Sequence, residues 1–203
     1  MIPSPCQKQR QEKMAGFESN QEERPLYDQM LEKLGQHKVD LKAIESKEEK
    51  GILKADIVEE YDDYINGVID SKDGHQNDVV STLAVWNFDA KRIDRGIEIT
   101  EYCIKHDIKP PHFFKSKFPT ILARELIEKW EIVTEQQFVL ARVIIEDLDM
   151  VDELKANFYK KYGLKIEENE PDIALELFER AMSLDPKSGL KGVISKLEKK
   201  LTS

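Results

Sequence analysis

The feature that most constrains this chain is a helical spacing of apolar residues, combined with few residues that interrupt helices. From Pro25 onward, apolar side chains recur every three or four positions, as in Leu26, Met30 and Leu34. This spacing is typical of one face of an α-helix. The 203 residues include only nine glycines and eight prolines, too few for the many tight turns of an all-β fold. We therefore predict an all-α fold.

The helical pattern predicts three regions. Residues 1–24 are polar with interspersed charges, and we expect a flexible N-terminal arm. Residues 25–74 carry two apolar stripes, which predict long helices with a break at Gly51 and a function in oligomerisation. The second stripe runs from Ile52 to Ile69 and ends at a turn signal, Ser71-Lys-Asp-Gly74. Residues 75–203 are predicted to form a helical-hairpin domain.

Within the last region, residues 77–109 have the pattern of two helices, with Asn77 or Asp78 as the N-cap and Gly96 where the helices cross. Further helices are expected near 119–130, 135–148, 152–163 and 187–201. Near the C-terminus, three residues have the spacing of the second tetratricopeptide helix: Ala174, Phe178 and Ala181. The expected fold is thus long N-terminal helices followed by helix-hairpin, tetratricopeptide-like repeats. Plain structural hairpins are the alternative reading of the same pattern.

Charge and cysteine content exclude several classes of protein. The formal net charge is −9, so contact with nucleic acid depends on local basic segments rather than on bulk attraction. Cys6 and Cys103 are far apart and support neither a disulfide framework nor a zinc site. Cys103 lies in an apolar helical stretch and is predicted to be buried. We expect no membrane span and no signal peptide, and therefore a cytosolic protein.

No catalytic, metal or cofactor site is predicted. The sequence has no glycine-rich phosphate loop, and its four histidines are scattered. Acidic residues cluster at 59–63 and 146–153, but consecutive carboxylates on a helix point in different directions. We therefore expect solvated helix faces there. The competing interpretation is a free-standing two-metal nuclease, which would depend on one or more of four carboxylates: Asp62, Asp63, Asp147 and Asp149.

Two segments are strongly basic. Residues 105–124 contain five lysines and arginines against one acidic residue, with phenylalanines and histidines between them. Residues 187–203 contain five lysines against Glu198 alone. Basic clusters in an acidic protein suit contact with DNA phosphates, which holds a protein on DNA without reading the sequence. Solvated faces and core aromatics are the alternative interpretation.

Several blocks of the sequence resemble a known family. They are Tyr27-Asp-Gln-Met-Leu-Glu-Lys-Leu34, Leu41-Lys-Ala-Ile-Glu-Ser-Lys-Glu48, Ile65-Asn-Gly-Val68, Trp86-Asn-Phe-Asp89, Gly96-Ile-Glu-Ile99 before Tyr102, Ala174-Leu175, Arg180-Ala181, Leu184-Asp185 and the lysine-rich last helix. In order and spacing they resemble the small terminase subunits of P-two-like tailed phages. The resemblance covers nearly the whole chain and is weakest across residues 110–165.

The resemblance implies a protein that works in the host cytoplasm without a membrane. Such a subunit recognises the cohesive-end packaging site on phage double-stranded DNA, forms a homo-oligomer and delivers the DNA to a large subunit with ATPase and nuclease domains. The small subunit of this family has been labelled the endonuclease subunit, which we attribute to the assembled complex. The residues expected to contact phosphate are Lys8, Arg10, Lys13, Lys115, Lys117 and Arg124. The stripes Leu26–Ile44 and Ile57–Ile69 are expected at a subunit interface.

The sequence departs from the family at its end. Some members carry a long, basic, proline-rich tail, whereas this chain stops at Leu201-Thr-Ser203. We therefore expect DNA contact to depend on the N-terminal arm and on residues 105–124. The alternative function is a tetratricopeptide-like protein-binding scaffold without a nucleic-acid role. The two differ in salt dependence, because only a DNA-binding protein would lose DNA affinity steeply as salt rises.

Overall fold

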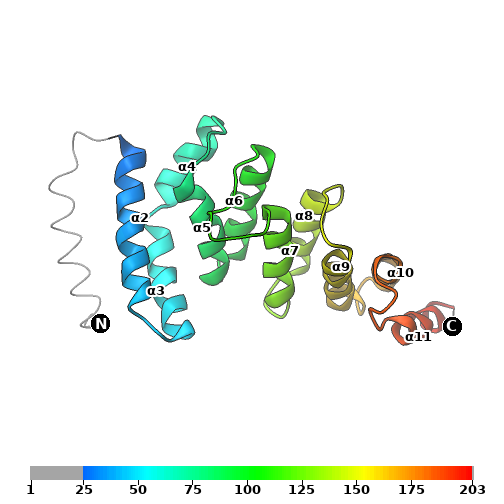
Figure 1. Ribbon diagram of the computed structural model, residues 1–203. Helices are drawn as coiled ribbons and strands as arrows, with labels where there is room; N and C mark the ends of the chain where they lie inside the picture. Colours follow the sequence, from blue (N-terminus) through cyan, green and yellow to red (C-terminus); the bar gives the residue numbers. More distant parts are fainter. Residues whose placement is uncertain (1–24, 203) are drawn as a thin grey trace. The chain divides into compact units, whose positions relative to one another are not determined.

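A computed structural model describes residues 25–202, which consist of helices and connecting segments without a β-strand (Figure 1). The predicted all-α fold is therefore confirmed. The chain divides into two compact units, with the boundary between Ser46 and Lys47. None of the helices within residues 25–202 has both the length and the apolar content needed to cross a bilayer.

The described part of the first unit contains one helix, α2 (Leu26–Lys42). Pro25 immediately precedes its first residue, in an extended conformation with φ −50° and ψ 138°. Proline suits this position because its missing N–H would have no partner within the helix. The predicted helix start is thus confirmed to within one residue.

The second unit, as far as residue 202, contains nine helices. They are α3 (Lys47–Glu59), α4 (Asp62–Ser71), α5 (Asp78–Asp89), α6 (Ile93–Lys105), α7 (Phe118–Glu128), α8 (Glu135–Ile145), α9 (Asp152–Ile166), α10 (Pro171–Leu184) and α11 (Lys191–Leu201). Two helices begin at side-chain caps. At the start of α5, the Asn77 side chain accepts a hydrogen bond from the Val80 N–H, and at the start of α8, Thr134 forms a capping box with Gln137. The sequence therefore marks these helix starts locally.

The sequence suggested one helix from Ile52 to Ile69 after a break at Gly51. The structure instead has two helices in this stretch, α3 and α4. Gly51 lies inside α3, because the break between the two stripes is at residues 43–46, between α2 and α3; a further break at Glu60 and Tyr61 separates α3 from α4. The break turns Tyr61 fully into the core, and it places Asp62 where Arg92 donates two hydrogen bonds of 3.2 and 2.6 Å to its carboxylate. These two contacts accompany a break that the local apolar spacing does not show.

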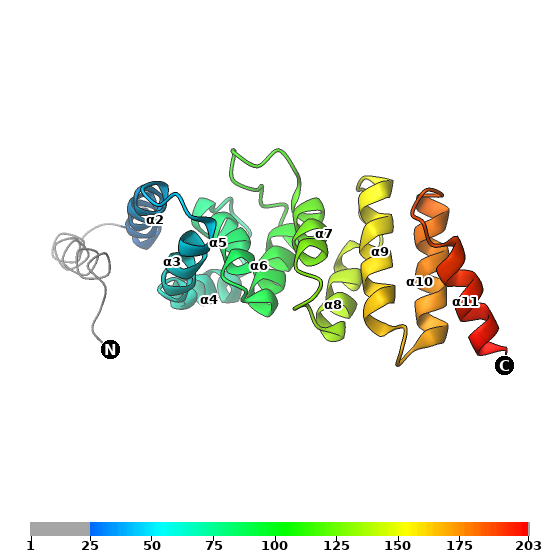
Figure 2. The same cartoon turned by 90° about the horizontal axis from the view of Figure 1, so that it is seen from below.

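The helices of the second unit form hairpins that pack on one another. Helices α5 and α6 form one hairpin and α9 and α10 another, each across a short turn, and α7 and α8 lie between them (Figures 1 and 2). Helix α7 packs on α9, and α6 on α8. A continuous core runs from Phe88 on α5 to Leu197 on α11.

Close approach within each hairpin depends on a glycine facing a phenylalanine ring. A Cβ atom at Gly96 would lie 2.8 Å from the ring of Phe88, and one at Gly163 would lie 2.5 Å from the ring of Phe178. Both rings are fully buried. Gly96 therefore lies at a helix crossing, as predicted, and any larger residue would push the two helices of the hairpin apart.

We predict that Gly163→Ala destabilises the protein by about 1–3 kcal/mol, because the added methyl overlaps a buried ring. Gly67→Ala is the matched control, since a Cβ there meets no atom within 4 Å. That control should raise the free energy of unfolding by up to about 1 kcal/mol through helix propensity. Urea denaturation of both variants measures the difference, and equal effects would contradict the proposed packing.

Candidate nucleic-acid interface

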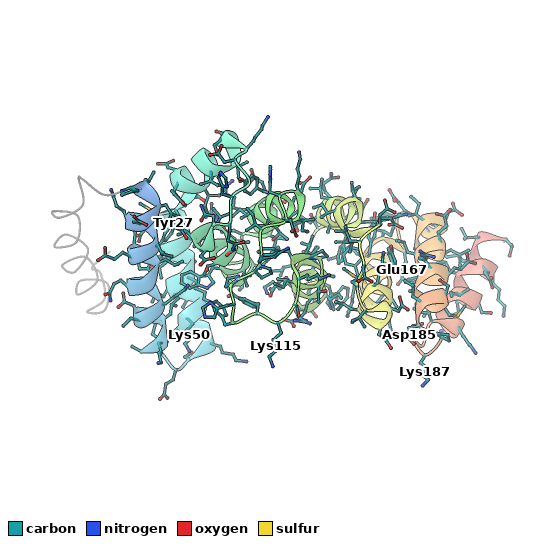
Figure 3. All side chains as sticks on the ribbon, turned by 45° about the horizontal axis from the view of Figure 1, so that its top comes forward. Tyr27, Lys50, Lys115, Glu167, Asp185 and Lys187 are labelled. Carbon is teal, nitrogen blue, oxygen red and sulfur yellow. The ribbon has the colours of Figure 1, made fainter. Side chains whose placement is uncertain are left out.

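Three of the six residues expected to contact phosphate lie in or just after the loop that joins α6 to α7. Lys115 and Lys117 are exposed on this loop, residues 106–117, and Arg124 is exposed on α7. Figure 3 shows Lys115 projecting away from the ribbon. No salt bridge is recorded for any of the three within residues 25–202. Their positive charges are therefore available to a ligand.

The start of α7 adds to this positive potential. Lys117 is the N-cap residue, in an extended conformation with no side-chain cap, and the first turn contains no acidic residue. The first N–H groups of a helix lack partners within it and carry a partial positive charge. Arg124 follows Lys117 by seven residues, which places it on the same side of α7 about 10 Å further along. Lys117 and Arg124 thus lie on one side of α7, and Lys115 lies on the loop two residues before the N-cap.

The loop is anchored to the segment between α4 and α5. The Gln76 side chain accepts a 2.9 Å hydrogen bond from the Lys109 N–H and donates a 3.2 Å bond to the Lys109 carbonyl. Ile108 and Pro111 are buried on either side of this pairing. Lys115 and Lys117 are therefore presented by a segment whose first half is fixed to the helical core.

The aromatic residues of this segment divide between core and surface. Phe118 is 2% exposed and belongs to the core, as the alternative interpretation expected. Phe113 is 53% exposed, and its ring contacts that of Phe114 with centroids 4.8 Å apart. Phe113 therefore presents an apolar surface next to the two loop lysines.

Helix α11 carries the second basic segment. Ile194 and Leu197 are buried against the rest of the unit, and the charged side faces solvent. The lysines of this segment are all exposed: Lys187, Lys191, Lys196, Lys199 and Lys200. In Figure 3, Lys187 and Lys115 both project from the lower edge of the ribbon. The turn before α11 and the α6–α7 loop thus each carry a lysine at the lower edge of the molecule in Figure 3.

Sequence reasoning missed one basic cluster, on α9. The Lys161 ammonium lies 4.1 Å from the centroid of the Trp130 ring, and that of Lys165 lies 5.7 Å from it. Lys165 also donates a 3.2 Å hydrogen bond to the carbonyl of Glu131. Both lysines are half-buried, and they hold α9 against the turn after α7 through cation–π contact. The sequence shows Lys161 and Lys165 four positions apart. It does not show that Trp130, 31 positions before Lys161, contacts both of them.

The carboxylates considered for a nuclease do not converge. Asp62 accepts hydrogen bonds from Arg92, and its Oδ1 also lies 3.5 Å from the Arg95 Nε. Glu146 pairs with Arg142 at 3.0 Å on α8. Residues 25–202 contain no group of three histidine, cysteine or acidic side chains placed to bind a metal ion. Asp62 thus links the start of α4 to α6, whereas Asp63, Asp147 and Asp149 are exposed.

Two other expectations concern residues outside this surface. Cys103 is fully buried, as predicted, and burial raises the pKa of its thiol to about 12, so the thiol stays protonated at neutral pH. Lys8, Arg10 and Lys13, the remaining residues expected to contact phosphate, lie outside the described residues.

Comparisons with known proteins identify similar sequences. A family model described as phage small terminase subunit matches residues 31–157. The protein named "Terminase, endonuclease subunit" of Escherichia phage P2 is 30% identical over 213 aligned residues, which cover 98% of this chain and 86% of the phage P2 protein. No solved structure gives a significant match.

We predict that Gln76→Ala frees the α6–α7 loop. Removal of the two hydrogen bonds to Lys109 should speed exchange of the Lys109 amide hydrogen by about two- to tenfold. Gln136→Ala is the matched control, because Gln136 is exposed on α8 and no hydrogen bond of its side chain is recorded. Hydrogen exchange measured by mass spectrometry or NMR tests this prediction. Unchanged exchange at Lys109 would show that its hydrogen bonds with Gln76 do not hold the loop.

Proposed function

Because this chain belongs to the phage small terminase subunit family, we propose that it binds phage double-stranded DNA at the cohesive-end packaging site, oligomerises and delivers the DNA to the large terminase subunit. The family model covers more than half of the chain, and the phage P2 relative aligns with nearly all of it. The DNA, the homo-oligomer and the large subunit with its ATPase and nuclease domains are the partners in this proposal.

The observation that carries the DNA-binding part is the set of exposed cations on the α6–α7 loop and α7. A chain with a net charge of −9 repels DNA as a whole, so contact requires positive charge concentrated at one place. Lys115 and Lys117 provide such a concentration at the N-terminus of α7, where unpaired N–H groups also attract phosphate, and Arg124 adds a third cation further along α7. The exposed lysines of α11 form a second basic surface, separated from the loop by α9 and α10.

Exposed apolar residues on α2 support an oligomer. Leu26, Leu31 and Val39 are 56%, 37% and 62% exposed, so this 17-residue helix presents aliphatic side chains that a second subunit can cover. Covering them by another subunit would remove this apolar surface from water. Both stripes of the expected interface need correction, because Leu34 and Leu41 of the first and Ile57 and Ile65 of the second are buried within the chain itself.

We further propose that cutting of DNA belongs to the complex with the large subunit. The name of the phage P2 relative includes the word endonuclease, and that name describes the relative. In this chain, Asp62 is engaged by two arginines, and Glu146 by one. These pairings favour a structural role for the acidic clusters.

The experiment that tests the proposed function combines solution mass with DNA binding. The full chain is mixed with a cohesive-end fragment or with unrelated DNA of equal length, each at two salt concentrations. We expect an oligomer that prefers the cohesive-end fragment and loses affinity steeply at the higher salt. A monomer that binds neither DNA would instead support the tetratricopeptide-like scaffold.

We predict that replacing Lys115, Lys117 and Arg124 together by alanine weakens binding to both DNA fragments. The slope of log K against log salt should become less steep by about 0.9 for each phosphate that is no longer neutralised, or about 3 in total. Lys47→Ala is a control for removal of an exposed cation elsewhere, on α3. An unchanged slope in the triple variant would remove these residues from the interface.

We also predict that the purified chain, given magnesium or manganese, fails to cut cohesive-end DNA. Gel analysis of plasmid and linear cohesive-end substrates measures this, with the chain plus large subunit as the positive control. Metal-dependent cutting by the chain alone that is abolished by Asp62→Ala, Asp63→Ala, Asp147→Ala or Asp149→Ala would contradict the prediction. Asp62→Ala should lower stability, because it leaves Arg92 without its partner.

A further inference from the structure

An apolar groove of about 190 Å³ lies between α6 and α8, two helices that pack side by side (Figure 1). Its surface includes Leu140 and Val143 of α8, which are 43% and 76% exposed. Ile97 of α6 and Ile144 of α8 complete its apolar lining. Leu140 and Val143 are thus the exposed aliphatic residues of the groove, beside a half-buried Ile144 and a buried Ile97.

The exposed residues of this groove lie away from the core side of α8. The core side of α8 buries Phe138, Ala141 and Ile145, and Val143 faces away from it. Valine has a lower helix propensity than glutamate, lysine or glutamine, so an exposed valine does not favour the helix either. A group of exposed aliphatic residues of this kind is typical of a surface that another protein covers.

The edge of the groove is acidic. It is lined by Asp94, Glu98 and Glu101, all exposed and all on α6, and by no basic side chain within residues 25–202. Glu98 accepts a 2.6 Å bond from Arg95, and Asp94 accepts a 2.9 Å bond from Gln137. Glu101 has no recorded ion pair in this described part of the chain. The unpaired charge at this edge is negative.

The negative charge at the edge of the groove favours some binding partners over others. DNA is repelled by carboxylates, so the groove does not extend the phosphate-binding surface. Two copies meeting through the same groove would bring like charges together, which disfavours a symmetric dimer here. A protein segment with an apolar side chain flanked by lysine or arginine satisfies both the apolar lining and the acidic edge.

We propose that the α6–α8 groove docks a basic, apolar segment of the large terminase subunit. This inference rests on the proposed function, which supplies the large subunit as a partner. The groove shares no residue with the proposed phosphate contacts on the loop and α7. One chain can therefore hold DNA and the large subunit through different residues at the same time.

The test uses the full chain and the purified large subunit of the same phage, with affinity measured by titration. Val143→Glu should weaken binding by about tenfold or more, because it removes an apolar contact and places a charge in the groove. Glu101→Lys should also weaken binding, because it repels a basic segment. Val151→Glu is the matched control: Val151 is 61% exposed, lies outside the groove and should leave the affinity unchanged.

Each variant is also measured for cohesive-end DNA binding and solution mass, which should equal those of the unchanged chain. Full-strength binding of the large subunit by both groove variants would overturn the docking site while leaving the proposed function intact. A lower oligomer mass for Val143→Glu, with large-subunit binding retained, would overturn it in favour of a second copy as occupant. Failure of the unchanged chain to bind both the large subunit and DNA would instead reject the proposed function.

Discussion

The arrangement of the second unit depends on two places where a phenylalanine ring lies directly against the backbone of a glycine. At Phe88 and Gly96, and again at Phe178 and Gly163, no Cβ atom separates the ring from the facing helix. Protein interiors are close-packed, so such contacts set the distance between helices. Helices α7 and α8 fill the space between the two hairpins and pack on both. The start of α7, and with it the basic loop, is therefore positioned by contacts that lie in the core.

The sequence predicted the features that depend on neighbours along the chain. Helix periodicity, the Asn77 cap and the burial of Cys103 all follow from local patterns, and the structure confirms them. The break at Glu60 and Tyr61 did not follow, because the contacts found there are distant in sequence: Asp62 pairs with Arg92, 30 residues away. Apolar spacing continues through the break, so periodicity alone indicates one helix. Gly51 illustrates the opposite error, since a glycine lowers helix propensity without preventing a helix that packs well.

In the candidate site, too, the sequence predicted local features but not contacts between distant residues. Basic composition identified Lys115, Lys117 and Arg124 as accessible cations, and all three are exposed. Composition did not show that Gln76 fixes the loop, because the two residues of that clamp are 33 positions apart. Nor did it show that Phe118 is core while Phe113 is on the surface. The α6–α8 groove likewise forms only when these two helices pack together, since its carboxylates belong to α6 and its most exposed aliphatic residues to α8.

The hydrogen bonds between Gln76 and Lys109 also determine how a mechanical load on the loop is carried. Tension applied to Lys115 or Lys117 reaches the helical unit at two points, the first turn of α7 and the Gln76 side chain. The second point lies on the segment between α4 and α5, so part of the load bypasses the C-terminal turn of α6. A pull on the loop is thus shared between the start of α7 and the segment before α5, and does not act on the C-terminal end of α6 alone.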